Sequence, residues 1–427
     1  MRSCPAESIW RDPHPFSAPD AILSSMVAIV LLVGCGPGVV EKSGEEMIQD
    51  TVMGGRREVH LGRLWANTWS RLEVASIDTL LSPSAEEPAI GRIDHVSLGE
   101  EGGLALVDGI SQEVWRKTLD GWELVTRSGE GPAEVGFAGG LWWLGDTLVV
   151  FDARRLRLLR FGPSGDPIGT GISLGSIGLP ETRTASRTAL GGTSSEVFVV
   201  GSDFPNMVGD FGIQRPKRVL LRVALTPEAL EPPDTLGIWP GRAWFLIEQG
   251  MGPLPFGPDT YLASAGESVM VCDGEKMEAW RIDRRGLPST RIVWEGAPES
   301  VGSRKTEFIE KGLSPLPPEG QARARGMLEA VPYPEMLPTV GRALAAGDEV
   351  WLAEWFGGEV ESLQENWPRT EWRIIQLTSP LRAWGLSFPP GVMPVQPLPG
   401  LGALVILMDD LGRQGVGIAN LEEDANG

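Results

Sequence analysis

One pattern recurs along this chain of 427 residues and constrains its fold more than any other feature. An apolar run that ends in an acidic residue is followed by an alternating run, a tight turn and another apolar run. The clearest copies begin with Leu104–Asp108, Leu148–Asp152 and Val269–Asp273. Weaker copies of the first run are Val197–Gly201, Val350–Glu354 and Leu404–Asp409.

Each copy predicts a strand buried on both faces, then a half-buried strand, a turn and a further strand. If positions 108, 152, 201, 273, 354 and 409 are equivalent, successive copies are 44, 49, 72, 81 and 55 residues apart. A four-stranded unit of about 40 to 50 residues has the size of one propeller blade. The sequence therefore predicts an all-β, six-bladed β-propeller of four-stranded antiparallel blades, with insertions in two of them and tryptophans packed between blades.

The last copy is short of one strand, because only residues 415–421 follow its apolar run. The alternating segment 70–77 near the start of the chain can supply the missing outer strand. We therefore expect an N-terminal strand to close the ring, which would hide the edges of the final sheet.

A resemblance to a known family rests on three segments. Ser128–Gly136, the strand Gly145–Asp152 and the hairpin Arg157–Gly165 resemble the glycine-rich segment and blade repeat of bacterial six-bladed β-propeller proteins, relatives of the NHL-repeat and TolB-like propellers. The resemblance covers roughly residues 64–421. This sequence departs from the family pattern at Val135 and through Phe204–Arg218. It implies the fold and says little about activity.

The N-terminal region has the pattern of a targeting segment. Residues 21–33 are uncharged and apolar, which suits the core of a signal peptide better than a membrane span. Residues 32–36, LVGCG, resemble the lipobox of bacterial lipoproteins, which implies lipidation of Cys35 after removal of residues 1–34. Residues 35–63 would then be a flexible tether and 64–427 the propeller. The alternative is a buried apolar strand or helix, with Cys35 at its end by coincidence and not lipidated.

The lipobox resemblance implies a protein of the bacterial cell envelope, held by lipid at the outer membrane and facing the periplasm or the exterior. Gly36 follows the cysteine where an aspartate would signal retention at the inner membrane. Acyl chains hold a protein at a membrane without spanning it.

Composition excludes several function classes. The formal net charge of −20 argues against a nucleic-acid partner. Three histidines and three cysteines are too few for a histidine-rich metal centre or a Cys4 zinc site. The chain also lacks the serine-hydrolase elbow, the phosphate-binding loop and the zinc-protease motif, so we expect no cofactor and assign no catalytic or metal-binding residue.

The longest interruption of the repeat is an insertion at residues 296–340. Two stretches in it have helix-forming composition and carry Arg304, Arg323 and Arg325 among several prolines. Long connections at one end of a rigid scaffold commonly bind ligands. We expect a partly helical rim or lid with these arginines as binding residues, and the alternative is simple packing along one blade.

Five further residues are candidates for ligand binding. Asp108, Asp152 and Asp273 end equivalent strands and could line one end of the channel, where carboxylates could hold a cation. Alternatively, each carboxylate could accept backbone N–H groups at a turn. Trp239 and Trp244 could offer aromatic faces to a sugar or peptide, or could fill gaps between blades.

The leading functional hypothesis is a lipid-anchored binding or scaffold module for a protein, peptide or glycan partner. The alternative is a hydrolase of the lactonase kind, with a divalent metal held by carboxylates at the propeller channel. The alternative requires at least three carboxylate or amide side chains that converge on one point. A purely structural stack of blades within a larger assembly would instead expose a large apolar patch.

Overall fold

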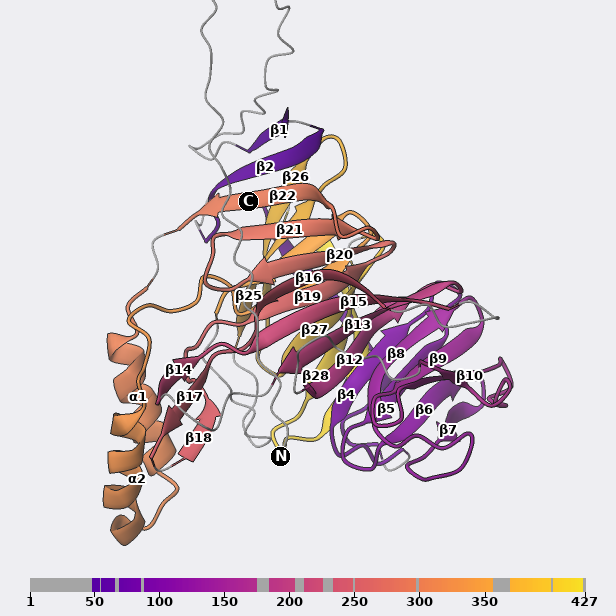
Figure 1. Cartoon of the computed structure of the whole chain (residues 1–427), viewed down its shortest axis with the longest axis horizontal. Coiled ribbons are helices and arrows are strands. Elements are labelled where there is room, and N and C mark those ends of the chain that lie inside the picture. The colour runs from indigo at the N-terminus through magenta and orange to yellow at the C-terminus, as the bar shows by residue number, and fades with distance from the viewer. Residues whose placement is uncertain are drawn as a thin grey trace, which may run out of the picture. The chain divides into compact units, whose positions relative to one another are not determined.

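The computed structural model describes residues 48–424, except 54, 66–68, 86–87, 175–183, 204–210, 226–232, 249, 297–298, 356–368 and 401. In these residues the chain is all-β apart from two helices (Figure 1). The predicted signal peptide and Cys35 lie outside the described residues. No described helix combines the length and the hydropathy that crossing a bilayer requires.

Three sheets contain four strands each, and neighbouring strands in each sheet are arranged in chain order, with β14 left out of the third. The first sheet contains β4 (Ile93–Leu98), β5 (Leu104–Asp108), β6 (Glu113–Thr118) and β7 (Gly121–Thr126). The second contains β8 (Ala138–Leu144), β9 (Thr147–Asp152), β10 (Arg157–Phe161) and β11 (Ile172–Ser173). The third contains β12 (Thr184–Gly192), β13 (Glu196–Asp203), β15 (Lys217–Ala224) and β16 (Asp234–Pro240).

Two larger sheets contain the same four-stranded unit with additional strands. The six-stranded sheet contains β19 (Thr260–Ala265), β20 (Ser268–Asp273), β21 (Glu278–Asp283), β22 (Pro288–Glu295), β2 (Arg56–Arg63) and β1 (Gln49–Met53). The eight-stranded sheet contains one unit of β23 (Arg342–Ala346), β24 (Glu349–Ala353), β25 (Thr370–Gln376) and β26 (Arg382–Phe388). Its other unit contains β27 (Val392–Leu398), β28 (Gly402–Met408), β29 (Gln414–Glu423) and β3 (Arg71–Leu81).

The strand β3 joins the two ends of the chain. It pairs antiparallel with β29 over most of its length, from Leu72 opposite Glu423 to Leu81 opposite Val416. It also pairs in parallel with β26, but only through two residue pairs. The segment 70–77 therefore lies beside the last unit, as its alternation indicated.

Apolar runs in the sequence become the second strands of the units, which are buried on both faces. All residues of β5, β20 and the final four residues of β24 are buried. Adjacent sheets pack on each other through these strands: Val107 of β5 and Val150 of β9, for example, share one hydrophobic cluster. Trp351 and Trp372 are fully buried in another, with ring centroids 6.3 Å apart.

The first strands of successive units contact one another in cyclic order. β4 contacts β8, β8 contacts β12, β12 contacts β19, β19 contacts β23, β23 contacts β27, and β27 contacts β4. We call these six the inner strands. The fold is β-propeller-like, because antiparallel meander sheets meet along their first strands and pack face to face.

The structure differs from the expected flexible tether at residues 49–53 and 56–63, which form β1 and β2. β2 pairs in parallel with β22, and β1 pairs antiparallel with β2. Val59 and Leu61 are buried in a cluster with Ile292, and Glu58 pairs with Arg291 at 2.8 Å. Because Val59 and Leu61 alternate with polar residues, a strand over residues 56–63 has one apolar face. Burying that face against β22 stabilises the strand relative to a solvated tether.

The long connections gather at one end of the sheets. Because strands alternate in direction, connections from second to third strands and from one unit to the next share one end. We call this the connection end. The strands that flank the four longest connections in the sequence, residues 204–216, 241–259, 296–341 and 354–369, begin or end there. The opposite end, which we call the hairpin end, carries turns such as 145–146, 266–267 and 347–348.

Three of the long connections form further structure, which we call the insertion cluster. It contains a three-stranded sheet of β14 (Gly212–Gln214), β17 (Trp244–Ile247) and β18 (Gly250–Pro253), and the helices α1 (Gly302–Leu313) and α2 (Pro318–Ala330). Both helices fall in the insertion expected at residues 296–340. α2 begins at a proline, whose missing N–H needs no partner in the first turn of a helix.

Candidate functional site

The three candidate aspartates lie at the connection end, each as the last residue of a second strand. Asp108 is buried, and its carboxylate accepts hydrogen bonds from the backbone N–H groups of Arg92 and Ile110 at 3.1 and 3.0 Å and from the Ser111 hydroxyl at 3.0 Å. It thus ties the turn after β5 to the segment that enters β4. This geometry is that of a turn residue whose lone pairs are used within the protein.

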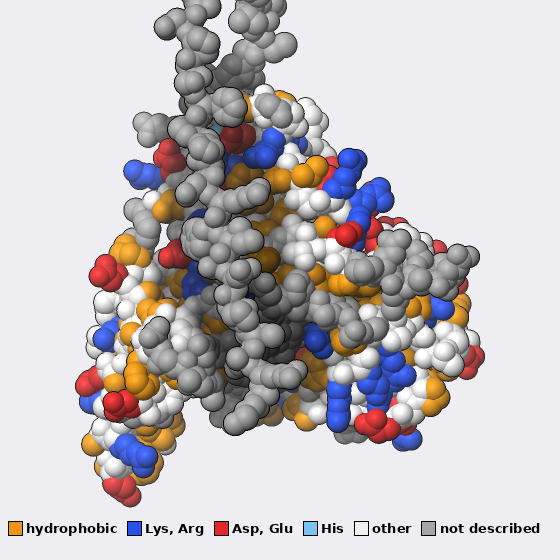
Figure 2. All heavy atoms as spheres, viewed as in Figure 1, with side chains coloured by type: hydrophobic (Ala, Val, Ile, Leu, Met, Phe, Trp, Pro, Cys, Tyr) orange, Lys and Arg blue, Asp and Glu red, His pale blue; other side chains and the backbone are white. Residues whose placement is uncertain are grey.

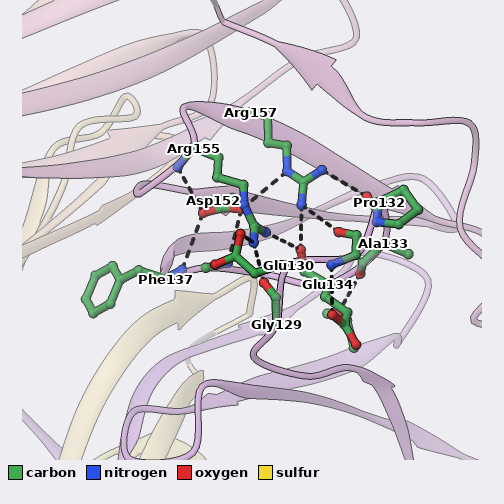
Figure 3. A network of polar contacts seen from close by, with 12 residues as sticks. Gly129, Glu130, Pro132, Ala133, Glu134, Phe137, Asp152, Arg155 and Arg157 are labelled. Atoms are coloured by element: carbon green, nitrogen blue, oxygen red, sulfur yellow. Dashed lines mark hydrogen bonds and ion pairs between the residues drawn. The ribbon is translucent and has the colours of Figure 1, made fainter.

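Asp152 lies at the centre of a larger polar network (Figure 3). It is fully buried and accepts backbone N–H groups of Gly136 and Phe137, at 3.1 and 3.3 Å, and of Arg155, at 3.2 Å. The guanidinium groups of Arg155 and Arg157 each lie 3.3 Å from its Oδ2. Two cations and three amides therefore compensate the cost of burying this charge.

The same two arginines hold the glycine-rich segment 128–136 that carries the family resemblance (Figure 3). Arg155 donates to the carbonyl oxygens of Glu134, at 2.9 Å, and Gly129, and pairs with the Glu130 carboxylate at 2.8 Å. Arg157 donates to the carbonyl of Pro132 at 3.0 Å. A loop without regular secondary structure is thus bonded firmly to the adjacent sheet.

The two glutamates of this loop are engaged as well. The hydrogen bond from Arg155 holds the pKa of the Glu130 carboxyl below its usual value. A hydrogen bond from the backbone N–H of Gly131, 2.8 Å long, does the same for the pKa of Glu134. Both carboxyls are held ionised at neutral pH, so neither is poised to act as a general acid.

Asp273 has a partner from a different unit. Arg215, which follows β14, donates to Asp273 at 3.1 Å, to Glu275 at 2.6 Å and to the carbonyl of Gly241 at 3.0 Å. The side chain therefore connects the insertion cluster to the end of β20. All three aspartates bond to protein groups of their own surroundings, and the described residues bring together no group of three or more His, Cys, Asp or Glu side chains that could hold a metal.

The insertion cluster has an aromatic core, which sequence reasoning did not identify. Phe256, which follows β18, lies 5.5 Å from Phe308 of α1 and 5.1 Å from Trp355 of the connection after β24, centroid to centroid. Tyr333, which follows α2, lies 6.0 Å from Phe256, and the Lys305 ammonium lies 4.6 Å from the Tyr333 ring. Three separate connections thus pack on one another.

Two features of this aromatic core set it apart from ordinary packing. Phe256 has a φ of 61°, a conformation that a bulky residue rarely adopts. The Tyr333 hydroxyl is buried and lacks a hydrogen-bond partner within the described structure, and burial raises the pKa of this phenol to about 12. The chain has only two tyrosines, Tyr261 and Tyr333, and this scarcity was the one sequence signal that could have drawn attention to both.

The candidate arginines of the insertion occupy the two helices. Arg325 of α2 pairs with Glu310 of α1 at 2.8 Å and so joins the helices. Arg304 of α1 is exposed, with Glu299 at 3.7 Å, and Arg323 is exposed on α2. Figure 2 shows charged and hydrophobic side chains mixed over these helices. The structure brings Arg304 and Arg323 to the same subdomain, with their guanidinium groups open to solvent.

The two candidate tryptophans lie in different sheets. Trp239 of β16 packs against the hydrophobic cluster that contains Phe198 and Leu220. Trp244 is half-buried in β17 of the insertion cluster. Exposed apolar side chains occur close by at Phe211 and Ile213, which are 65% and 48% exposed at the edge strand β14.

No model of a known protein family matches this sequence, and no curated protein matches it. Solved structures with partial similarity include a Bacteroides fragilis protein described as exported, with 9% identity, a TM-score of 0.45 and coverage of 86% of this chain and 99% of that one. A DUF4221 family member from Bacteroides vulgatus has 10% identity, a TM-score of 0.45 and coverage of 84% and 100%. Virginiamycin B lyase from Staphylococcus aureus has 13% identity, a TM-score of 0.35 and coverage of 81% and 99%. At these identities and scores, the similarities say nothing about activity.

Proposed function

We propose that this chain is a binding module of the bacterial cell envelope, anchored by lipid at Cys35, and that its units form a closed six-bladed ring. The cyclic contacts of the inner strands and the pairing of β3 with β29 support the ring. The partner, a protein, peptide or glycan, binds at the connection end.

One observation supports the binding role: in the part of the chain that the structure describes, the three connections that form additional strands or helices all belong to the connection end. Rigid scaffolds typically present binding residues on such loops. The insertion cluster there offers exposed arginines on α1 and α2 and exposed apolar residues at β14, whereas the hairpin end has mostly short turns. The metal-dependent hydrolase has no corresponding support, because the described residues bring together no group of three or more His, Cys, Asp or Glu side chains that could hold a metal.

Partner capture tests the binding role. The full chain, displayed on cells or vesicles, is crosslinked to envelope proteins and glycans and compared with the double variant Arg304→Glu, Arg323→Glu. Arg284→Glu, an equally exposed arginine at the hairpin end, is the matched control. We expect the double variant to lose at least tenfold in captured partner and the control to lose none. Equal capture by all three proteins would remove the connection end as the binding site.

The lipid anchor is tested separately by labelling cells with a clickable fatty acid. We expect Cys35→Ser to lose both the label and its sedimentation with membranes, since buried acyl chains would hold the protein at the bilayer. A variant that still sediments with membranes and carries lipid would contradict the assignment of Cys35.

A further inference from the structure

One corner of the six-stranded sheet exposes apolar side chains. β1 is the edge strand of this sheet, outside β2 and β22 (Figure 1). Its last two residues, Val52 and Met53, are 73% and 68% exposed. Leu287, in the turn between β21 and β22, is 57% exposed. Packing against the described residues therefore leaves most of these three side chains open to solvent.

The strand register places the three residues at the same end of the sheet. β2 runs parallel to β22, with Arg57 opposite Thr290, and antiparallel to β1, with Met53 opposite Arg56. The β1–β2 turn and the turn that carries Leu287 are therefore neighbours at the hairpin end. Because adjacent strands are about 4.8 Å apart, only about 10 Å separates β1 from β22. The apolar side chains thus belong to one surface.

Asp283 fixes the turn that carries Leu287. Its carboxylate accepts hydrogen bonds from the backbone N–H groups of Arg285 and Leu287, each 2.9 Å long. Gly286 has a φ of 78°, and a Cβ added to it would lie 2.9 Å from the carbonyl oxygen of Leu236 in the neighbouring unit. Leu287 is therefore held exposed by a bonded, closely packed turn.

Arginines flank these apolar side chains. Arg56 and Arg285 are exposed, and no ion pair joins either of them to a described carboxylate. The Arg56 guanidinium lies over the Trp280 ring of β21, 5.4 Å from its centroid. The third arginine, Arg284, pairs with Glu267 at 3.0 Å and is not counted. Two positive charges without a paired carboxylate thus lie at one corner of a chain whose formal net charge is −20.

This combination matches the surface of a bilayer that contains anionic lipids. Exposed apolar side chains enter the boundary between headgroups and acyl chains, and arginines are attracted to the phosphates of the headgroups. The predicted anchor is close enough. Gln49 begins β1 and follows Cys35 by 14 residues, which span at most about 50 Å. β1 covers only about 17 Å from Gln49 to the exposed corner, so lipid at Cys35 and this corner can reach one bilayer.

We propose that Val52, Met53, Arg56, Arg285 and Leu287 form a membrane-docking corner, which contacts the headgroup region of a bilayer containing anionic lipids. The proposal rests on the proposed function for the nearby membrane, and it adds a protein surface to the lipid anchor. Because the docking corner lies at the hairpin end, docking directs the connection end, with its insertion cluster, away from the bilayer.

A polarity-sensitive dye at Ser289→Cys tests the contact, because Ser289 is exposed near Leu287 and is not one of the five docking residues. In a chain with Cys4→Ser, lipid blocks Cys35 and burial protects Cys272, so the dye reacts at position 289. The full chain is anchored in vesicles of equal parts phosphatidylcholine and phosphatidylglycerol that contain nitroxide-labelled lipid. We expect a blue shift and quenching at position 289. The same dye at Leu411→Cys, 76% exposed at the connection end, should be quenched at least fivefold less.

Two double variants separate the apolar and the charged contributions. Met53→Asp with Leu287→Asp removes the apolar contact, and Arg56→Glu with Arg285→Glu reverses the charge. Each should reduce quenching at position 289 at least fivefold without lowering Tm, since all four side chains are exposed. Leu411→Asp, the same apolar-to-acidic change at the connection end, should leave quenching unchanged. Vesicles of phosphatidylcholine alone should quench severalfold less, and equal quenching by both compositions would overturn the role of the arginines.

The contradicting outcomes are specific. Equal quenching at positions 289 and 411, or full quenching in both double variants, would overturn the docking corner. So would a dimer that shifts the dye at position 289 before lipid is added, because a second copy would then cover the edge of β1. If Cys35 carries no lipid, the labelled chain is added to the vesicles from solution. Absence of the fatty-acid label therefore refutes the anchor, whereas absence of quenching in a lipidated chain refutes the docking corner.

Discussion

The role of Asp152 can be decided by one isosteric substitution. Asp152→Asn preserves the size of a fully buried side chain that accepts hydrogen bonds from three backbone amides and two guanidinium groups. The new side chain keeps one acceptor oxygen, but its NH₂ group faces N–H donors in place of the second oxygen. Arg155 and Arg157 also lose their shared counter-charge. Removing one partner of a buried ion pair typically costs about 3–5 kcal/mol.

Asp409 provides the matched comparison, since it ends the equivalent region of the last unit. It accepts hydrogen bonds from the amides of Leu411 and Arg413, each 3.0 Å long, and pairs with Arg413, but both side chains are partly exposed. Water screens such exposed pairs, so they contribute little to stability. Asp409→Asn should therefore cost far less than Asp152→Asn.

Urea denaturation at pH 7 measures both free energies of unfolding. With a slope of about 3 kcal/mol per M, Asp152→Asn should lower the midpoint by about 1 M or more, and Asp409→Asn by a third of that or less. If Asp152→Asn were as stable as the wild type, its carboxylate would be dispensable to the fold. The structural interpretation would then fail, and Asp152 would return as a candidate ligand-binding residue.

Three further outcomes follow from the structure. Gly415→Ala should lower the unfolding temperature by several degrees, because its Cβ would lie 2.3 Å from the Leu81 carbonyl oxygen where β29 meets β3. Protection of the 128–136 loop from hydrogen exchange, measured relative to the intrinsic rate at each pH, should fall as the pH drops through the range in which Glu130 protonates: the Arg155 hydrogen bond lowers the folded-state pKa of Glu130, so its contribution is present above the unfolded pKa and lost on protonation. Cys272 is buried and its pKa is raised, so the native thiol should resist iodoacetamide at pH 8 and react after unfolding.

Each of these has its own control. Gly326→Ala on α2 meets no atom within 4 Å and should leave the unfolding temperature unchanged or raise it. The pH effect should vanish in Glu130→Gln, and an identical pH profile in that variant would assign it to another group. Labelling of native Cys272, in a chain with serine at the other two cysteines, would contradict its burial.

The all-β class was predictable because it depends on local patterns. Runs such as Leu104–Asp108 and Val269–Asp273 had to be buried on both faces, and they form β5 and β20. The helices of the insertion were also predictable, since prolines and helix-forming residues mark their limits. The blade count and the closed ring stay part of the proposal, and the lipidation of Cys35 stays a prediction outside the described residues.

Some features of the structure depend on tertiary contacts, which local sequence patterns do not predict. The segment 56–63 looked like a tether because the residues around it are polar and turn-rich without clear periodicity, yet Val59 and Leu61 are buried where it pairs with the edge of β22. The aromatic core of the insertion cluster joins Phe256, Phe308 and Trp355 across about a hundred residues, and no spacing rule predicts that meeting. The aspartates at strand ends kept two interpretations until their hydrogen-bond partners were known.

The pairing of β3 with β29 has a consequence for how the protein is made. Ser76 and its hydrogen-bond partner Asn420 are 344 residues apart. At about 5–20 residues per second, a ribosome needs roughly 17–70 s to synthesise that interval. During this time β3 exists without β29, so the newborn chain carries an unpaired strand until β29 has been synthesised.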